Sequence, residues 1–331
     1  MRVVITGASG FLGRQLTAEL LRTRNFSGWP ITRLVLADRI APPDDSVTGD
    51  SRVDVVHGDL HADLGAVFAE PVDVVFHLAA AVSAECEADF DLGWHANLDT
   101  TRALLEAARA QQVAGRGVPR LVFASSLAVY GADPALPLPP VVSEATPALP
   151  QSSYGVQKLM CEQLIGEYTR RGFIDGRVAR LMTVAVRPGK PNAAASGFLS
   201  SIIREPLAGL PATCPVHPGL RVALASPRRT IDGLLRIAQA QRGSGPGQWE
   251  GRLPVNLPAL TVTVADLLTA LRRVAGDQAA NLVTITPDPA IEALVGSWPA
   301  AFDNRRAARL GLHPDPSALS LIRDYLGTLS P

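Results

Sequence analysis

The stretch Arg2-Val-Val-Ile-Thr-Gly-Ala-Ser-Gly-Phe-Leu-Gly13 decides the fold. It begins with a short apolar run rich in β-branched residues, which is typical of a buried parallel strand. Gly7, Gly10 and Gly13 follow, and a helical pattern with leucines on one face comes next. Strand, glycine turn and helix in this order predict a cradle for the pyrophosphate of a dinucleotide. The reason is that Gly10 lets the backbone approach the ligand, while the helix N-terminus offers free N–H groups. A tight loop without a ligand is the alternative.

The composition is that of a globular chain with a large core: 331 residues, 47% hydrophobic and 19% charged, with a formal net charge of zero. A neutral chain argues against nucleic acid and anionic membrane surfaces as partners. Cys86, Cys161 and Cys214 stand far apart, so we expect no metal site, no disulfide framework and a cytoplasmic location. No signal peptide is visible, and the longest apolar stretch, around Val72–Val82, is too short to span a bilayer.

Strand and helix patterns alternate from residue 1 to about residue 187. This alternation predicts an α/β fold with a doubly wound, mostly parallel sheet and helices on both faces. Ligands of such folds bind outside the carboxyl ends of the strands, so the residues just after each strand are candidates for chemistry. The strands expected after the first are Arg33–Asp38, Val53–Asp59, Val72–Ala80, Arg120–Ser126 and Arg177–Val186, and a long helix with Leu98, Leu104 and Leu105 precedes Arg120.

The sequence changes character after Arg187, where prolines break the chain into short pieces. We therefore expect a dinucleotide-binding domain at residues 1–187 and a smaller, mostly substrate-binding domain at residues 188–331 that caps the carboxyl edge of the sheet. About residues 227–245, with a helix at Thr230–Gln241, are expected to return to the first domain. The other expected elements are helices near Val264–Val274 and Ala318–Leu326 and a short strand near Leu282–Ile285.

Asp38 ends the second expected strand, 25 residues after Gly13. A carboxylate at this place accepts hydrogen bonds from the adenosine ribose and repels a 2′-phosphate. Asp38 therefore predicts NAD rather than NADP, while Arg39 beside it keeps NADP open; a helix or turn cap is the alternative role. Asp59 and Leu60 follow the third strand, where they either flank the adenine or simply form a turn.

Tyr154 and Lys158 follow Ser152-Ser153, a typical helix start, so their spacing of four places both side chains on one helical face. A free phenol has a pKa near ~10, and a nearby ammonium is expected to lower that pKa. Such a pair takes a proton from an alcohol while a cofactor accepts the hydride. Ser126, at the end of the fifth strand, is expected to hold the substrate oxygen. The alternatives are an exposed helix face for the pair and a strand-end cap for the serine.

Several motifs together resemble those of the extended short-chain dehydrogenase/reductases. In chain order they are Thr6-Gly-Ala-Ser-Gly-Phe-Leu-Gly13, His77-Leu-Ala-Ala80, Asn97-Leu-Asp-Thr-Thr101, Ser125-Ser126 with Val129-Tyr-Gly131, and Tyr154-x-x-x-Lys158. The resemblance covers roughly residues 1–190 and implies a Rossmann fold, NAD as cofactor and a small C-terminal substrate domain.

The same resemblance implies roles for individual residues. Tyr154 would be the general base, Lys158 would bind the nicotinamide ribose, and Ser126 would bind the substrate hydroxyl. Together with the patterns above, it implies that the cofactor is bound by Gly7, Gly10, Phe11, Leu12, Gly13, Asp38, Asp59, Leu60, Leu78, Ala79, Ala80, Asn97, Tyr154 and Lys158.

Departures from the family's patterns narrow the activity. Leu127 and Ala128 stand where the nucleotide-sugar dehydratases of this group carry Asp-Glu, so the acid and base for water elimination are missing. Lys190 stands where the sugar-nucleotide epimerases carry an asparagine that touches a substrate phosphate. Three segments resemble the D-erythronate dehydrogenases: Val186–Leu207, Ser297–Phe302 and Arg306–Gly311. This resemblance implies oxidation of the C2 hydroxyl of a small sugar acid with NAD, from D-erythronate to 2-oxo-tetronate. A nucleotide-sugar epimerase with tightly bound NAD is the alternative.

A small sugar acid needs a cation for its carboxylate. Lys190 follows the edge of the sixth strand, and the guanidinium of Arg204 is able to hold a carboxylate through two parallel hydrogen bonds. We expect these two ahead of Arg228 and Arg229, with ordinary surface charge as the alternative for each. Ser83, just past the fourth strand, is expected to bind a substrate hydroxyl.

Two helices, around Asn97–Ala108 and Tyr154–Tyr168, carry apolar residues on more than one face. The sheet covers one side of such a helix, and the other side also needs cover. Extended members of the family pair these helices across a two-fold axis, which implies a homodimer. Burial within one subunit is the alternative.

Overall fold

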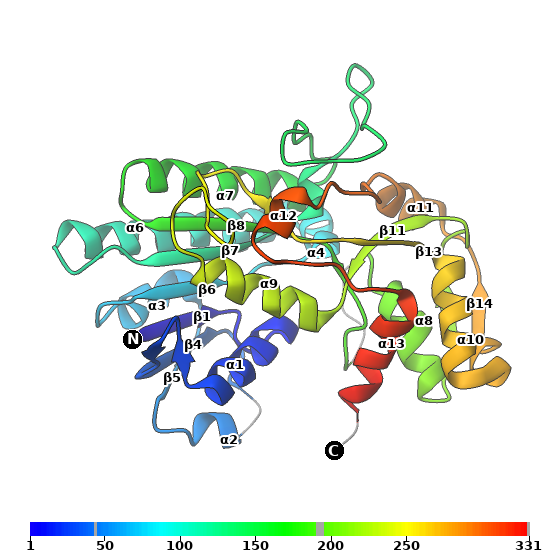
Figure 1. The fold of residues 1–331 in the computed structure, drawn as a ribbon, viewed down its shortest axis with the longest axis horizontal. Coiled ribbons are helices and arrows are strands. Elements are labelled where there is room, and N and C mark those ends of the chain that lie inside the picture. The colour runs from blue at the N-terminus through cyan, green and yellow to red at the C-terminus, as the bar shows by residue number, and fades with distance from the viewer. Residues whose placement is uncertain (43–44, 190–194, 330–331) are drawn as a thin grey trace.

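A seven-stranded sheet, in which all neighbouring strands are parallel, forms the centre of the molecule (Figure 1). The computed structural model describes residues 1–42, 45–189 and 195–329. The strand order is β12-β8-β7-β6-β1-β4-β5, so the chain builds one half outward from β1 and then crosses to build the other. The predicted Rossmann-type α/β fold is confirmed. The strands are β1 (Arg2–Thr6), β4 (Arg33–Asp38), β5 (Val53–His57), β6 (Val74–His77), β7 (Arg120–Ser126), β8 (Asp175–Leu181) and β12 (Val255–Asn256).

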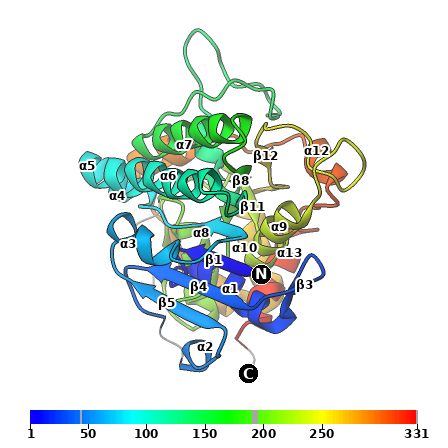
Figure 2. The same ribbon diagram turned by 90° about the vertical axis from the view of Figure 1, so that its left-hand side faces the viewer.

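The apolar run of β1 alternates between the two faces of this sheet. Val3 and Ile5 belong to the core cluster that α1 and α9 complete, whereas Val4 belongs to the cluster under α3, α6 and α7. A strand covered on both faces must be apolar at successive positions, which explains its sequence. Figure 2 shows α6 and α7 side by side. The helices are α1 (Phe11–Thr23) and α9 (Pro227–Gln239) on one face, and α3 (Leu60–Val67), α6 (Thr100–Val113) and α7 (Ser153–Arg170) on the other.

The helix predicted ahead of β7 has an unusual beginning. The short helices α4 (Ser83–Ala88) and α5 (Phe90–Gly93) lead into a π-helical segment, η1 (Trp94–Asp99), and the regular helix α6 starts only at Thr100. Wider turns of this kind are often found at functional sites. Here the segment holds Asn97 in a buried position, with 2% of its surface exposed.

A smaller unit, on the right in Figure 1, has a core of its own. Its main sheet pairs β11 (Arg221–Ala225) in parallel with β9 (Thr183–Val184) and antiparallel with β13 (Leu260–Thr263). The chain thus enters this unit slightly before residue 187, and the division at 187 stays a prediction. The other elements of the unit are β10 (Ala212–Cys214), β14 (Val283–Ile285), α8 (Phe198–Leu207), α10 (Val264–Ala280), α11 (Pro289–Gly296) and α13 (Ala318–Gly327). Helix α10 extends to Ala280, beyond Val274, where we expected it to end. Gly276, with φ 79°, interrupts the helix, and the chain returns to helical geometry after this residue.

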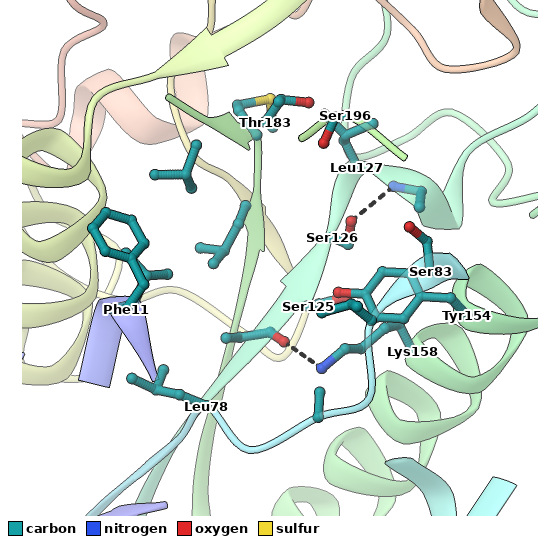
Figure 3. A pocket seen from close by; sticks show the side chains of 18 of the residues that line it. Phe11, Leu78, Ser83, Ser125, Ser126, Leu127, Tyr154, Lys158, Thr183 and Ser196 are labelled. Carbon is teal, nitrogen blue, oxygen red and sulfur yellow. Dashed lines mark hydrogen bonds between the residues drawn. The ribbon is translucent and has the colours of Figure 1, made fainter. Parts of the chain in front are cut away.

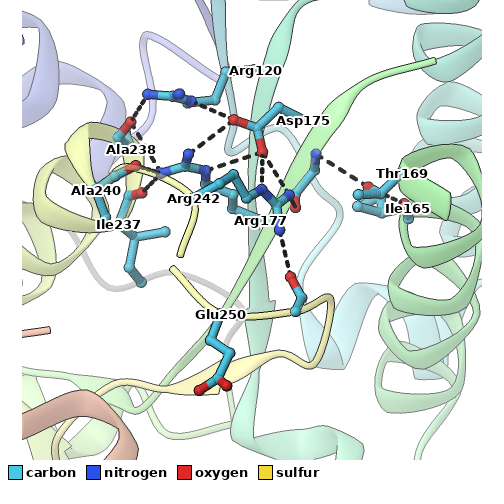
Figure 4. A network of polar contacts seen from close by, with 12 residues as sticks. Arg120, Ile165, Thr169, Asp175, Arg177, Ile237, Ala238, Ala240, Arg242 and Glu250 are labelled. Atoms are coloured by element: carbon cyan, nitrogen blue, oxygen red, sulfur yellow. Dashed lines mark hydrogen bonds and ion pairs between the residues drawn. The ribbon is translucent and has the colours of Figure 1, made fainter. Parts of the chain in front are cut away.

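Helix α9 packs on β7 and β8, so residues 227–239 lie against the large sheet. A network of hydrogen bonds and ion pairs fixes its C-terminal end at the amino ends of these strands (Figure 4). Arg177 is fully buried and donates from Nη1 to Ile237 O and Ala240 O. The carboxylate of Asp175 accepts from Arg177 Nη2 at 2.9 Å and from Arg120 Nε at 2.8 Å. Burial raises the pKa of Asp175, but its hydrogen bonds and the charges of the arginines outweigh burial and lower that pKa to about 2.

The remaining described elements are short. They are the hairpin β2 (Asn25–Phe26) and β3 (Trp29–Pro30), α2 (Asp45–Thr48), the 3₁₀ turn η2 (Leu127–Val129) and α12 (Arg305–Arg309). Within residues 1–42, 45–189 and 195–329, no helix is long and apolar enough to cross a bilayer.

Candidate active site

A cavity of about 320 Å³ lies where the carboxyl ends of the central strands meet the smaller unit (Figure 3). Phe11 and Leu78 stand at one end of it, and Thr183 and Ser196 stand at the other. Most of the predicted site residues converge on this cavity. Those that line it are Gly7, Gly10, Phe11, Leu12, Gly13, Leu78, Ala80, Ser83, Ser126, Tyr154 and Lys158.

The glycine loop leaves no space for side chains. Gly7 has φ 71°, and a Cβ on it would lie 2.7 Å from Ala79 N. A Cβ on Gly13 would lie 2.1 Å from Gly7 O, so the start of α1 packs directly on the turn. Gly10 precedes the first residue of α1 and provides no side-chain cap, which leaves the N-terminal N–H groups of the helix available to phosphate oxygens. These features fit the pyrophosphate of a dinucleotide.

A second cavity, of about 530 Å³, continues from the first on the other side of the glycine loop. Both cavities are lined by Gly7, Gly10, Leu78 and Ala80, so together they form one extended groove. The predicted residues Asp38, Asp59, Leu60 and Ala79 line the second cavity, and Arg39 and His95 line it as well. A groove that passes over a glycine turn, with a carboxylate at its far end, has the layout that a dinucleotide requires.

Backbone hydrogen bonds fix the two carboxylates of this second cavity. Asp38 accepts from Ser9 N at 2.9 Å and from Ile40 N at 3.1 Å, which holds it at the end of β4. Asp59 accepts from His61 N at 3.1 Å and so caps α3. For Asp59 the alternative that we considered was a simple turn; the residue caps α3 and lines the groove at the same time.

Asn97 acts on the groove through the backbone and not by direct contact. It does not line either cavity; its side chain accepts from Ala81 N at 2.8 Å and donates to Gln157 Oε1 at 2.8 Å. These bonds connect the segment after β6 to α7, so Asn97 positions the backbone around Leu78–Ala81.

Helix α7 brings Tyr154 and Lys158 to the end of β7. Ser152 caps the helix by accepting from Gly155 N at 3.1 Å. A Cβ on Gly155 would lie 2.2 Å from Ala128 O, so glycine allows the helix to approach the strand end closely. Lys158 Nζ donates to Ala124 O at 2.9 Å and lies 4.6 Å from the ring centroid of Phe123.

The pKa values of this pair differ from our expectation. Burial raises the pKa of Tyr154 to about 12, while the Ser126 hydroxyl and the charge of Arg187 act in the opposite direction. Burial also lowers the pKa of Lys158 to about 8. The prediction of a lowered tyrosine pKa is therefore wrong, because desolvation of the phenolate is the largest effect on Tyr154.

A buried ion pair supports the site from behind. Glu162, one turn after Lys158, accepts from Arg180 Nε at 2.9 Å and from Arg180 Nη2 at 2.6 Å. Ser125, the neighbour of Ser126, donates to the same carboxylate, and Arg180 Nη1 donates to the Tyr130 hydroxyl. One carboxylate thus joins α7, β7 and β8 next to the cavity, which Ser125 also lines.

Of the two basic residues that we expected to bind a carboxylate, the structure describes only Arg204. Lys190 lies outside the described residues. Arg204 does not line the cavity: its guanidinium donates to Arg187 O at 2.8 Å and pairs with Glu205. Arg187 is the arginine that lines it, and burial lowers the pKa of this guanidinium.

Sequence reasoning also missed several residues at the Thr183 end. Their only sequence signal was position. Thr183 lies in the last part of the expected sixth strand, Arg177–Val186, and Arg187 follows that strand. Trp298 lies in a segment singled out by resemblance alone. The missed lining residues include Met182, Thr183, Val184, Arg187, Ser196 and Trp298.

Across the described part of the chain, His, Cys, Asp and Glu side chains form no cluster able to hold a metal ion.

A family model described as "NAD dependent epimerase/dehydratase family" matches residues 3–220. The chain belongs to the NAD-dependent epimerase/dehydratase family. It is 49% identical to a D-erythronate dehydrogenase of Cupriavidus necator, with 98% of each chain covered. It is 40% identical to a D-erythronate dehydrogenase of Haemophilus influenzae, with 98% of this chain and 99% of the other covered.

The fold comparison agrees with this membership. The nucleoside-diphosphate-sugar epimerase from Agrobacterium tumefaciens superposes with a TM-score of 0.90 at 39% identity, covering 99% of this chain and 95% of the other. The predicted family and cofactor are confirmed: this family member is an NAD-dependent oxidoreductase, and the groove over the glycine loop fits NAD.

Proposed function

We propose that this enzyme oxidises the C2 hydroxyl of D-erythronate to 2-oxo-tetronate with NAD, and that Tyr154 is the general base. The observation that carries the proposal is a single cavity in which Tyr154, Ser126 and Arg187 meet beside the glycine loop. The two relatives named D-erythronate dehydrogenase, which match over nearly their whole length, support the choice of substrate.

Tyr154 and Ser126 act on the reacting hydroxyl. Ser126 Oγ holds the C2 hydroxyl next to the phenol, and the Tyr154 oxygen takes the hydroxyl proton as the carbonyl forms. NAD, when bound, supplies the acceptor for the hydride that leaves C2. Because burial raises the pKa of Tyr154 to about 12, the phenolate needs cations nearby. Lys158 and Arg187 both line the cavity and supply this positive charge, and Lys158 also binds the nicotinamide ribose.

Arg187 is the cation that we assign to the substrate carboxylate. In a 2-hydroxy acid the carboxylate is bonded to the reacting carbon, so its cation must lie close to the base. Arg187 meets this condition, since its charge acts on Tyr154. Arg204, paired with Glu205 outside the cavity, does not meet it. Ser83, Thr183 and Ser196 line the same cavity and provide hydroxyl groups for the remaining substrate hydroxyls.

A screen of free aldonic acids with NAD, followed by NADH absorbance, tests the proposal. We expect net NADH with D-erythronate and weaker or no signal with other acids. The nucleotide-sugar epimerase is the alternative, since the Agrobacterium protein is described as one. That alternative predicts turnover of a nucleotide sugar without net NADH. If the enzyme gives this result and forms no NADH with any free acid, the epimerase function replaces our proposal.

We further propose the homodimer expected from the helices around Asn97–Ala108 and Tyr154–Tyr168, with α5, which precedes the first of them, adding to the interface. Phe90, stacked on Trp94, is 59% exposed, and Val156 and Met160 of α7 are 38% and 37% exposed. These apolar side chains are not covered within one subunit, and pairing of the same face in a second copy would cover them. Light scattering at micromolar concentration is expected to give the mass of two chains; a mass of one chain contradicts the proposal.

A further inference from the structure

The segment Ser297–Phe302 brings one large side chain, that of Trp298, to the substrate end of the cavity. Trp298 follows α11 and lines the cavity together with Thr183, Arg187 and Ser196. Its side chain packs against two apolar clusters, one containing Leu127 and the other containing Val186. Leu12 and Leu78, at the cofactor end, pack against a different cluster. The indole is therefore part of the wall opposite the cofactor.

Hydrogen bonds make this wall rigid. Thr261 Oγ1 donates to Ala300 O at 2.6 Å, which ties the segment to β13. Val142 N donates to Ala301 O at 2.9 Å, and Asp303 N donates to Val142 O at 2.8 Å. The backbone after Trp298 is thus held from two sides, so the indole has little freedom to move away from a longer ligand.

The space in front of this wall is small. The same 320 Å³ has to accept the nicotinamide end of NAD and the whole substrate. Ser126 and Tyr154 fix the position of C2, and Arg187 fixes the carboxylate, so every additional carbon of a longer acid has to extend toward the remaining walls. A bulky indole in such a wall excludes longer chains, since a packed pocket does not yield without strain.

We propose that Trp298 sets the chain length of the sugar acid, admitting a four-carbon acid and rejecting five- and six-carbon aldonates. This inference rests on the proposed function. It gives a physical role to a segment that sequence reasoning singled out by resemblance only, and it makes Trp298 a residue that determines specificity rather than rate.

Replacement of Trp298 by smaller side chains, with kcat/KM measured on four-, five- and six-carbon aldonic acids, tests the inference. In Trp298→Leu we expect the ratio of kcat/KM for the six-carbon acid to that for the four-carbon acid to rise about tenfold or more, mainly through KM. Trp298→Phe keeps an aromatic ring and should shift the ratio in the same direction by less. Trp29→Leu, at a tryptophan that is 68% exposed on β3, is the matched control and should leave the ratio unchanged.

The outcomes separate the two proposals. NAD affinity and melting temperature show whether each variant is folded, and Trp298→Phe provides the measurement if Trp298→Leu is unstable. If the wild type oxidises the four-carbon acid but the folded Trp298 variants keep the wild-type ratio of kcat/KM values, the role of Trp298 is overturned. The proposed function then stands. A wild-type enzyme that oxidises no free sugar acid overturns the proposed function and this inference with it.

Discussion

The two ends of β7 and β8 both hold buried ionisable side chains, but Asp175 at the amino ends is paired with opposite charges, whereas Tyr154 and Lys158 at the carboxyl ends are in no ion pair of the described residues. At the amino ends, Asp175 is paired with Arg120 and Arg177, and the pKa of Asp175 is lowered to about 2, so that the ions are retained. At the carboxyl ends, burial raises the pKa of Tyr154 to about 12 and lowers that of Lys158 to about 8, so that burial makes the charged form of each group less favourable.

This difference follows from what each cluster has beside it. The amino-end cluster joins α9 to the sheet, and the arginines around Asp175 stabilise the charged form of this carboxylate. Lys158 has no ion pair within the described parts of the chain and lies next to a cavity. Buried groups with shifted pKa values in a cleft are typical of catalytic sites, whereas compensated pairs are typical of structure. The amino ends of these strands therefore hold charges that stabilise the fold, while the carboxyl ends hold the candidates for chemistry beside the structural ion pair of Glu162 and Arg180.

The largest effect is expected at the carboxyl end. Tyr154→Phe removes the proton acceptor and should lower kcat by about 10²–10⁴, which is the usual contribution of general acid–base catalysis. The free energy of unfolding and NAD affinity, measured by denaturation and by fluorescence titration, should stay close to wild type. Near-normal turnover in this variant would show that the shifted pKa of Tyr154 has no catalytic meaning.

The opposite pattern is expected at the amino end. Asp175→Asn leaves Arg177 buried without its carboxylate and should lower the free energy of unfolding by about 3 kcal/mol, within the range for a broken buried pair. The kcat of the folded variant should not change. Asp232→Asn, which breaks the exposed pair with Arg236 on α9, is the control and should cost below about 1 kcal/mol. Equal losses in the two variants would mean that burial of Arg177 does not matter.

The pH dependence of stability should come from the same carboxylate. Because its pKa is lowered to about 2 in the folded state, Asp175 stabilises the protein fully above the unfolded pKa of about 4. This contribution, about 2 kcal/mol, is lost as the pH falls from about 4 toward 2. Denaturation curves across this range should show a smaller acid destabilisation in Asp175→Asn than in the wild type. Parallel curves for the two proteins would contradict the assignment.

A smaller effect is expected for the arginines near the cavity. Arg187→Ala should raise KM for the acid by about ten- to a hundredfold, the usual effect of losing hydrogen bonds to a charged group, and leave NAD affinity intact. Arg204→Ala removes the bond to Arg187 O and the partner of Glu205, so it should mainly reduce stability. If Arg204→Ala raises KM more than Arg187→Ala does, the assignment of the substrate carboxylate to Arg187 is wrong.

The sequence by itself determined the parts of this protein that local chain geometry controls. The β-branched run of β1, the three glycines behind it and the regular alternation that follows predict the sheet and the cofactor groove, because each constrains only a few successive residues. The Tyr154–Lys158 pair was predictable for the same reason, since a helix always places residues four apart on one face. Asp38 and Ser126 were predictable from their places at strand ends.

Only the tertiary structure decided which side chains share the cavity and how they are charged. Arg187 and Arg204 are equally basic in sequence, but Glu205 engages Arg204, while Arg187 lines the cavity with Tyr154. Trp298 reaches the same cavity from a segment more than a hundred residues away in the chain. The pKa of Tyr154 was predicted with the wrong sign, because sequence spacing shows the nearby ammonium but not the burial that outweighs it. Contact and desolvation between distant segments depend on how the whole chain packs, and no local pattern records them.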